Sequence, residues 1–166
     1  LQTLQTHTPS HGLARSLRNN SIGPTGAKAL ADALASGKGV MKKLVLSDNT
    51  IKDEGAIAIG ESLKTNSTLE TLELFRCGIG AAGGKAIGEA LRLGIAVLTN
   101  LDLSGNSIGG YYNDYRKFVK DLSGVKALSD ALASGRAVLT TLKCAFRACI
   151  CELHLQTCTH TFSLLA

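Results

Sequence analysis

Cysteine and histidine side chains gather late in the sequence, where their types and number suit zinc. The stretch 149–160 contains Cys149, Cys151, His154, Cys158 and His160. Thiolates and imidazoles are common zinc ligands, but this spacing matches no known zinc pattern, and Cys149 falls on a place that a repeat reserves for an apolar residue. We therefore expect no metal site and no cofactor. Residues 150–166 are interpreted as an irregular tail or cap, with a zinc site and a disulfide-stapled cap as the alternatives.

The sequence motifs give little support for a catalytic function. The sequence contains no phosphate-binding loop that ends in Gly-Lys-Ser/Thr and no His-Glu-x-x-His helix. The four histidines, His7, His11, His154 and His160, lie only in the two ends, outside the periodic part of the chain. We expect a protein that is not an enzyme and has no catalytic residue.

Glu73, Phe75, Arg76 and Asp102 form the most distinctive group of polar and aromatic residues. They fall at outward positions of two neighbouring predicted strands, so they are expected to lie side by side. Arginine and aromatic side chains are frequent anchors of protein interfaces. These residues therefore predict a partner-binding surface; the alternative is a strand face that is merely solvated.

A second candidate surface is an insertion around residues 110–122. It carries Tyr111, Tyr112, Tyr115 and Phe118, and thus all three tyrosines of the chain. We predict a loop that projects from one edge of the fold and binds a partner, because insertions in repeat proteins often serve binding. The alternative is an inert loop whose tyrosines pack on the adjacent repeat, since loops tolerate insertions at little cost.

A repeated pattern of about 28 residues positions both groups. One copy has Leu98, Leu101, Leu103, Asn106 and Ile108. Two leucines that are two residues apart on an extended segment face the same side, and an asparagine at the following turn can satisfy the freed backbone groups. Related copies begin near Leu17, Met41, Leu69 and Leu139, with Cys77 and Arg147 in the asparagine place and Arg15 in a leucine place.

After each strand, a glycine opens a stretch with helical spacing. Leucine or isoleucine follows four and eight residues later, which gives one apolar helix face; the glycines are Gly26, Gly55, Gly83 and Gly124. Small residues five positions on, Gly60 and Gly88 among them, permit close helix packing. Eleven positions on, Gly37, Asn66, Gly94 and Gly135 are expected to end the helices in the left-handed conformation. Thr25 and Ser123 are predicted as N-caps.

Composition limits the classes of function. The 166 residues are 45% hydrophobic, enough for one domain with a sizeable core, and no run of about 18 apolar residues suggests a membrane span. The net charge of +5 comes from interleaved charges rather than a basic run. We expect neither nucleic-acid nor membrane binding.

The pattern Leu-x-x-Leu-x-Leu-x-x-Asn/Cys-x-Ile-Gly, followed by a Gly-Ala/Lys-Ala-Leu/Ile helix, resembles the ribonuclease-inhibitor-like class of leucine-rich repeats. It is most similar to the repeat region of NOD-like receptors and more distantly to the GTPase-activating protein for Ran. The resemblance implies an α/β leucine-rich-repeat solenoid, a curved right-handed segment with parallel strands on the concave face and helices on the convex face. The expected organisation is an N-terminal cap or scar over residues 1–12 and repeats over 13–149.

The function expected from these observations is a non-enzymatic, cytoplasmic module that holds a protein partner on its strand face and aromatic insertion. One alternative is a regulator that stimulates a small GTPase, for which Arg76 and Arg116 are the only candidates. Another is a structural segment of a longer receptor or scaffold. Uncovered ends of the repeat stack predict possible self-association.

Overall fold

Strands and helices alternate along the chain in the computed structural model, which describes residues 13–37 and 41–144. The elements are β1 (Leu13–Ser16), α1 (Pro24–Ala35), β2 (Met41–Val45), α2 (Lys52–Leu63), β3 (Thr71–Glu73), α3 (Ala81–Leu93), β4 (Asn100–Asp102), β5 (Gly110–Tyr112), β6 (Phe118–Lys120), α4 (Ser123–Ala133) and β7 (Thr141–Lys143). Residues 1–12 and the cysteine- and histidine-containing tail lie outside the described residues, as do the predictions made for them.

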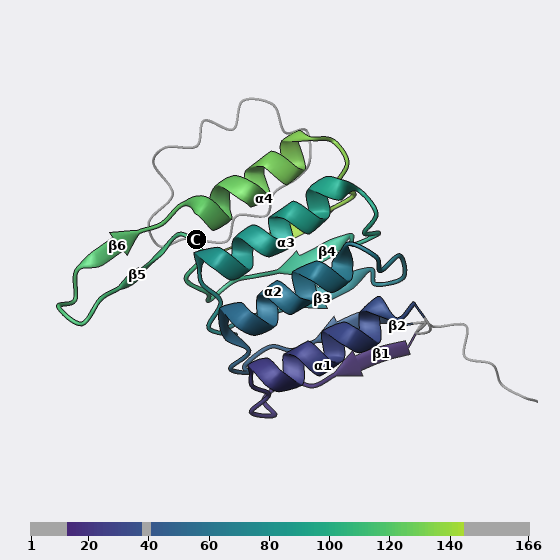
Figure 1. Ribbon diagram of the computed structural model, residues 1–166, viewed down its shortest axis with the longest axis horizontal. Helices are drawn as coiled ribbons and strands as arrows, with labels where there is room; N and C mark the ends of the chain where they lie inside the picture. The colour runs from purple at the N-terminus through teal and green to yellow at the C-terminus, as the bar shows by residue number, and fades with distance from the viewer. Residues whose placement is uncertain (1–12, 38–40, 145–166) are drawn as a thin grey trace, which may run out of the picture.

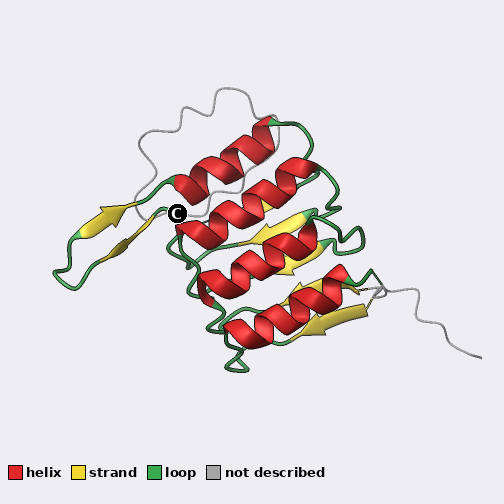
Figure 2. Cartoon of the chain, viewed as in Figure 1, coloured by secondary structure: helices red, strands yellow, loops and turns green. Residues whose placement is uncertain are grey.

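Five strands form one parallel sheet in the order β1-β2-β3-β4-β7. Leu44 of β2 pairs with Leu72 of β3, which pairs with Leu101 of β4, so equivalent positions of successive repeats stand side by side. The four helices form a second layer on one side of the sheet (Figures 1 and 2). The predicted α/β leucine-rich-repeat solenoid is confirmed.

The core lies between these two layers and follows the predicted apolar positions. The strand leucines Leu44, Leu72 and Leu101 are at most 1% exposed, as are the helix residues Ile59 and Ile87. The equivalent Leu30 in α1 is only half-buried, because among the described residues α1 packs against one helix, α2, whereas α2 and α3 each lie between two. No helix in the described part of the chain is long and apolar enough to cross a membrane.

The asparagine place joins each repeat to the preceding one. Asn106 Nδ2 donates to the carbonyl oxygens of Leu74 and Leu103 at 2.7 and 2.9 Å, and its Oδ1 accepts from the amides of Cys77 and Ile79 at 3.0 Å each. One amide therefore satisfies four backbone groups at the end of the strands, as the spacing predicts. Asn49 does the same two repeats earlier in the stack.

Helix ends differ from the prediction at several places. Thr25 and Ser123 lie inside α1 and α4 rather than at their N-caps, which are Gly23 and Leu122. In α1 the cause is Pro24, whose fixed φ already suits the first helical position. These two N-cap predictions are wrong.

At the C-terminal ends, Gly94 ends α3 with a φ of 72°, as expected. Asn66 is not among the residues of positive φ. It is 4% exposed, and its side chain donates to the Leu34 carbonyl oxygen at 2.9 Å while accepting from the Leu69 amide at 2.8 Å. The amide group is thus used to join two repeats, and the prediction of a left-handed conformation at this residue is wrong.

Candidate functional site

The sheet register places the outward side chains of successive strands in rows. Glu73 of β3 and Asp102 of β4 are direct partners, with Val45 of β2 and Lys143 of β7 on either side. Hydrogen bonds beyond the short strands continue the rows, because the Arg76 amide donates to the Ser104 carbonyl oxygen at 3.0 Å. The structure therefore brings the predicted strand-face residues together.

The two acidic members of this group have basic partners. Glu73 Oε1 lies 2.7 Å from Lys43 Nζ, and Asp102 Oδ2 lies 3.9 Å from Lys143 Nζ. Asp102 Oδ1 also accepts hydrogen bonds from the amide and the hydroxyl of Ser104. Both carboxylates are therefore held by neighbouring side chains on the strand face.

Arg76 and Phe75 form a compact pair at the edge of the strand face. The guanidinium carbon of Arg76 lies 5.0 Å from the centre of the Phe75 ring, within range of a cation–π interaction. Arg76 is exposed and Phe75 is half-buried. The ring therefore supports the cation and leaves its donors turned to solvent.

The insertion is an antiparallel hairpin rather than the predicted loop. Tyr111 of β5 pairs with Val119 of β6, and Tyr112 pairs with Phe118. Asn113 closes the turn, because its amide donates to the Lys117 carbonyl oxygen at 3.0 Å and its side-chain oxygen accepts from the amides of Tyr115 and Lys117. Local pairing of this kind satisfies backbone groups that a plain loop would leave to solvent.

The tyrosines remain exposed in this hairpin, which projects from the side of the solenoid where α4 begins (Figure 1). Tyr111, Tyr112 and Tyr115 are 54, 66 and 90% exposed. The Tyr112 and Phe118 rings meet edge to face at 5.3 Å. The hairpin therefore has its own small aromatic contact and still presents three phenol rings.

The two candidate groups are separate. Arg76 contacts Phe75 beside β3, and Tyr112 contacts Phe118 within the hairpin, whereas within residues 13–37 and 41–144 no ion pair or ring contact joins one group with the other. The candidate residues thus form two surfaces and no single pocket.

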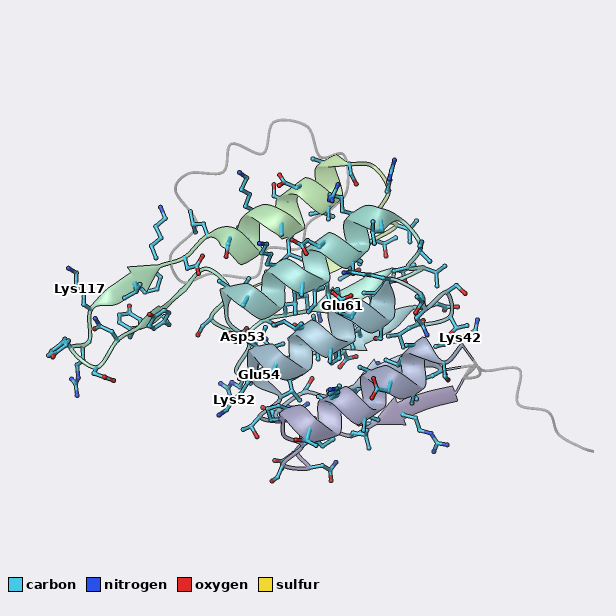
Figure 3. The ribbon with its side chains drawn as sticks, in the orientation of Figure 1. Lys42, Lys52, Asp53, Glu54, Glu61 and Lys117 are labelled. Carbon is cyan, nitrogen blue, oxygen red and sulfur yellow. The ribbon has the colours of Figure 1, made fainter. Side chains whose placement is uncertain are left out.

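A depression between two repeats was not found from the sequence. It is lined by Thr50, Lys52, Asp53, Glu54 and Gly78, and Figure 3 shows three of these side chains near the start of α2, apart from Lys117 on the hairpin. Asp53 Oδ1 accepts from the Gly80 and Gly83 amides at 2.8 Å each. This carboxylate therefore caps α3 of the next repeat, which has no cap of its own.

A residue spacing similar to that of serine hydrolases, which was not identified from the sequence, precedes the hairpin. Residues 105–109 read Gly-Asn-Ser-Ile-Gly, which has the spacing of the Gly-x-Ser-x-Gly turn. Ser107 is exposed at a repeat turn, its amide donates to the Ile79 carbonyl oxygen at 2.8 Å, and a hairpin rather than a helix follows. The described residues contain no histidine to act as a base, so the run is explained by the repeat.

Residues 13–37 and 41–144 contain no group of three or more histidine, cysteine, aspartate or glutamate side chains placed to hold a metal ion. Burial raises the pKa of the Cys77 thiol to about 11 and that of Cys144 to about 12. Both thiols are therefore protonated near neutral pH and poor nucleophiles.

Comparisons with known proteins agree with this architecture. A leucine-rich-repeat family model matches residues 16–31, 40–60 and 65–88. Ran GTPase-activating protein 1 of Xenopus laevis is 37% identical over 70 residues, which are 41% of this chain and 12% of that protein. The actin-binding site 2 structure of leiomodin-1 superposes with a TM-score of 0.60 at 22% identity, covering 81% of this chain and 70% of that one. The second likeness shows the fold alone.

Proposed function

The chain is a leucine-rich-repeat solenoid, and from this premise we propose that it is a non-enzymatic module that binds a protein partner. The partner contacts two surfaces: the strand-face group of Glu73, Phe75, Arg76 and Asp102, and the aromatic hairpin formed by β5 and β6. We also propose that the repeats are of the type found in NOD-like receptors and that the protein is located in the cytoplasm. Cell fractionation checks the location.

The observation that carries the proposal is the exposure of the hairpin tyrosines. Tyr115 is 90% exposed and Tyr112 66%, although large aromatic groups gain most from leaving water. Tyrosine combines a large apolar contact area with a hydrogen-bonding hydroxyl and few rotatable bonds, which makes it a frequent residue at protein interfaces. The insertion around residues 110–122 thus adds exposed aromatic surface to this repeat.

Affinity capture tests the proposal with a variant that leaves the hairpin intact. Tyr111→Ser combined with Tyr115→Ser removes two exposed rings and keeps the Tyr112–Phe118 ring contact. We expect at least about tenfold weaker capture of a specific partner, since interface aromatics often contribute more than about 1 kcal/mol each. Circular dichroism must first show that both proteins fold.

Val138→Ser is the matched control, because Val138 is an apolar side chain that is 53% exposed outside the hairpin. Capture should be unchanged in this variant. If the tyrosine variant also captures the same partner equally well, the hairpin is not the binding surface and the strand-face group alone remains. If neither surface affects capture by the folded protein, the binding proposal is wrong.

The identity with Ran GTPase-activating protein 1 favours a second candidate, stimulation of a small GTPase. The matched segment covers only 12% of that protein, and a repeat pattern by itself raises the identity between any two such solenoids. Arg76 and Arg116 remain the candidates for a catalytic cation. Single-turnover GTP hydrolysis by Ran, with and without the chain, distinguishes the two: the module proposal expects an unchanged rate, and a stimulation that is lost in Arg76→Ala or Arg116→Ala supports the second.

A third candidate is a structural segment of a longer protein, which the partial coverage of the relative supports. The half-buried Leu30 at the open side of α1 marks a face where another repeat or a second copy could pack. Sedimentation at increasing concentration tests self-association. We expect binding to neither nucleic acid nor membrane vesicles, and a dimer with no captured partner would favour the structural role.

A further inference from the structure

At the outward positions of the strands, which exclude the inward-register Arg15 of β1, the charges are balanced except at one residue. The outward and edge positions of the described strands and their following turns carry four cations and three carboxylates, so one positive charge is left: Arg18, Lys43, Asp48, Glu73, Arg76, Asp102 and Lys143. Each carboxylate has a cation in the adjacent repeat, the third pair being Arg18 with Asp48 at 2.8 Å. Arg76 forms no ion pair within the described part of the chain.

The backbone at this position does not favour an arginine. Four repeats place an equivalent residue in the left-handed region: Asn19 has a φ of 56°, Asp48 of 57°, Arg76 of 49° and Gly105 of 72°. Asparagine, aspartate and glycine adopt this conformation readily, whereas a long side chain does so at a cost of roughly 1 kcal/mol. The turn conformation therefore does not explain why an arginine is present at this position. Residues with unfavourable backbone conformations are concentrated at functional sites.

The neighbouring repeat leaves room for the arginine. A Cβ atom on Gly105 would lie 2.7 Å from Arg76 Cγ and 3.2 Å from Phe75 Cε2. Any other residue at position 105 would therefore displace the arginine stem or the ring beneath its guanidinium. Gly105 leaves space for the Arg76 stem, and the Phe75 ring contacts the guanidinium, which limits its freedom and lowers the entropy that it would lose on binding.

We propose that Arg76, supported by Phe75 and Gly105, is the anchor that receives a carboxylate of an acidic side chain on the protein partner. This inference rests on the proposed function and names the chemistry of the partner. A planar guanidinium binds a carboxylate through two parallel hydrogen bonds. One carboxylate neutralises the single uncompensated charge, whereas a phosphate of about two negative charges would leave excess negative charge close to Asp48 and Glu73.

A titration followed by NMR tests the anchor directly. The probes are a decapeptide of glutamate, a decapeptide of glutamine and inorganic phosphate, and the readout is the Nε–Hε resonance of Arg76. We expect a saturable shift with the glutamate peptide alone. Arg76→Gln should weaken peptide binding at least about fivefold, which corresponds to about 1 kcal/mol.

Arg18→Gln is the matched control, because it removes the same unit of charge from an arginine that is already paired. It should keep peptide binding within about twofold of the original. Arg76→Asn is a second variant, which should fold because asparagine adopts the left-handed conformation readily. We expect it to raise the urea midpoint and abolish peptide binding.

The proposal is overturned if the glutamate peptide does not bind, if Arg18→Gln and Arg76→Gln weaken it equally, or if phosphate binds as tightly. These outcomes are separate from a failure of the proposed function. A partner that is captured equally by the folded Arg76→Gln variant leaves the binding module in place and removes only the anchor.

Discussion

Cys77 and Asn106 show at the scale of one residue how the repeats are joined. Asn106 satisfies four backbone groups, three of them in the preceding repeat. Cys77 holds the equivalent place one repeat earlier, where its Sγ donates to the Leu46 carbonyl oxygen at 3.2 Å. A thiol is a weaker donor and acceptor than an amide, so it performs the same role with fewer and weaker bonds.

Replacing Asn106 by alanine should therefore destabilise the fold by about 2–4 kcal/mol, since buried backbone groups lose their partners. Asn20→Ala is the control, because Asn20 Nδ2 makes only an exposed bond to the Arg18 carbonyl oxygen at 3.0 Å; its cost should stay below about 0.5 kcal/mol. Urea unfolding measures both. Equal losses would show that the interior amide contributes no more than the terminal one.

The Cys77 thiol also makes stability depend on pH. Burial raises its pKa from 9.0 to about 11 in the folded chain, so both states keep the proton below pH 9. Between about pH 9 and 11 the unfolded chain loses the proton and the folded chain retains it, and stability falls as pH rises. We expect a shallower fall of the urea midpoint over this range in Cys77→Ala than in the original protein. Parallel pH profiles would contradict this effect.

At the scale of one element, helix α3 depends on a neighbour for its start. Its N-cap, Gly80, offers no side chain, and Asp53 of α2 accepts from the Gly80 and Gly83 amides instead. A carboxylate at this position also suits the positive end of the helix dipole. The first turn of one helix thus stabilises the first turn of the next.

Asp53→Ala should accordingly cost about 1–2 kcal/mol, the usual range for loss of an N-cap. Asp53→Asn keeps an acceptor and should recover part of that loss. Glu54→Ala alters the exposed neighbouring residue and should change stability by less than about 0.5 kcal/mol. Thermal unfolding measures the three variants, and an Asp53→Ala protein as stable as Glu54→Ala would rule out the cap.

At the scale of the whole molecule, the stack depends on how closely successive helices approach. A Cβ atom on Gly88 would lie 2.6 Å from the backbone carbon of Ala127 in α4, and one on Gly60 would lie 2.9 Å from that of Ala86 in α3. Backbone atoms cannot move aside as the end of a flexible side chain can. Glycine at these two places therefore sets the spacing between repeats.

Gly88→Ala tests this spacing, because the intrinsic preference of the helix and the packing act in opposite directions. Alanine favours a helix by about 1 kcal/mol over glycine, but the clash with α4 should outweigh that gain and leave a net loss of about 2 kcal/mol. Gly23→Ala is the control, since nothing lies within 4 Å of its added Cβ. If Gly88→Ala stabilises the protein in urea, the helices are not in the close contact described above.

The repeat, the sheet register and the buried positions could be predicted without the fold, because each depends on spacing along one chain. Leu44, Leu72 and Leu101 recur at a fixed interval, and stacking is the way in which such short units bury their apolar faces. The same spacing predicted the row of Glu73 and Asp102. The residues of the strand-face group were therefore accessible without coordinates.

Features that depend on contacts between repeats could not be predicted from this spacing. The pairing of Glu73 with Lys43, the cap that Asp53 provides and the inward use of Asn66 join residues that are far apart in sequence. The hairpin was missed because its strands, of three residues each, are too short for an alternating pattern to emerge. The uncompensated charge of Arg76 is likewise visible only when every neighbouring carboxylate has been placed, since an ion pair depends on distance in space.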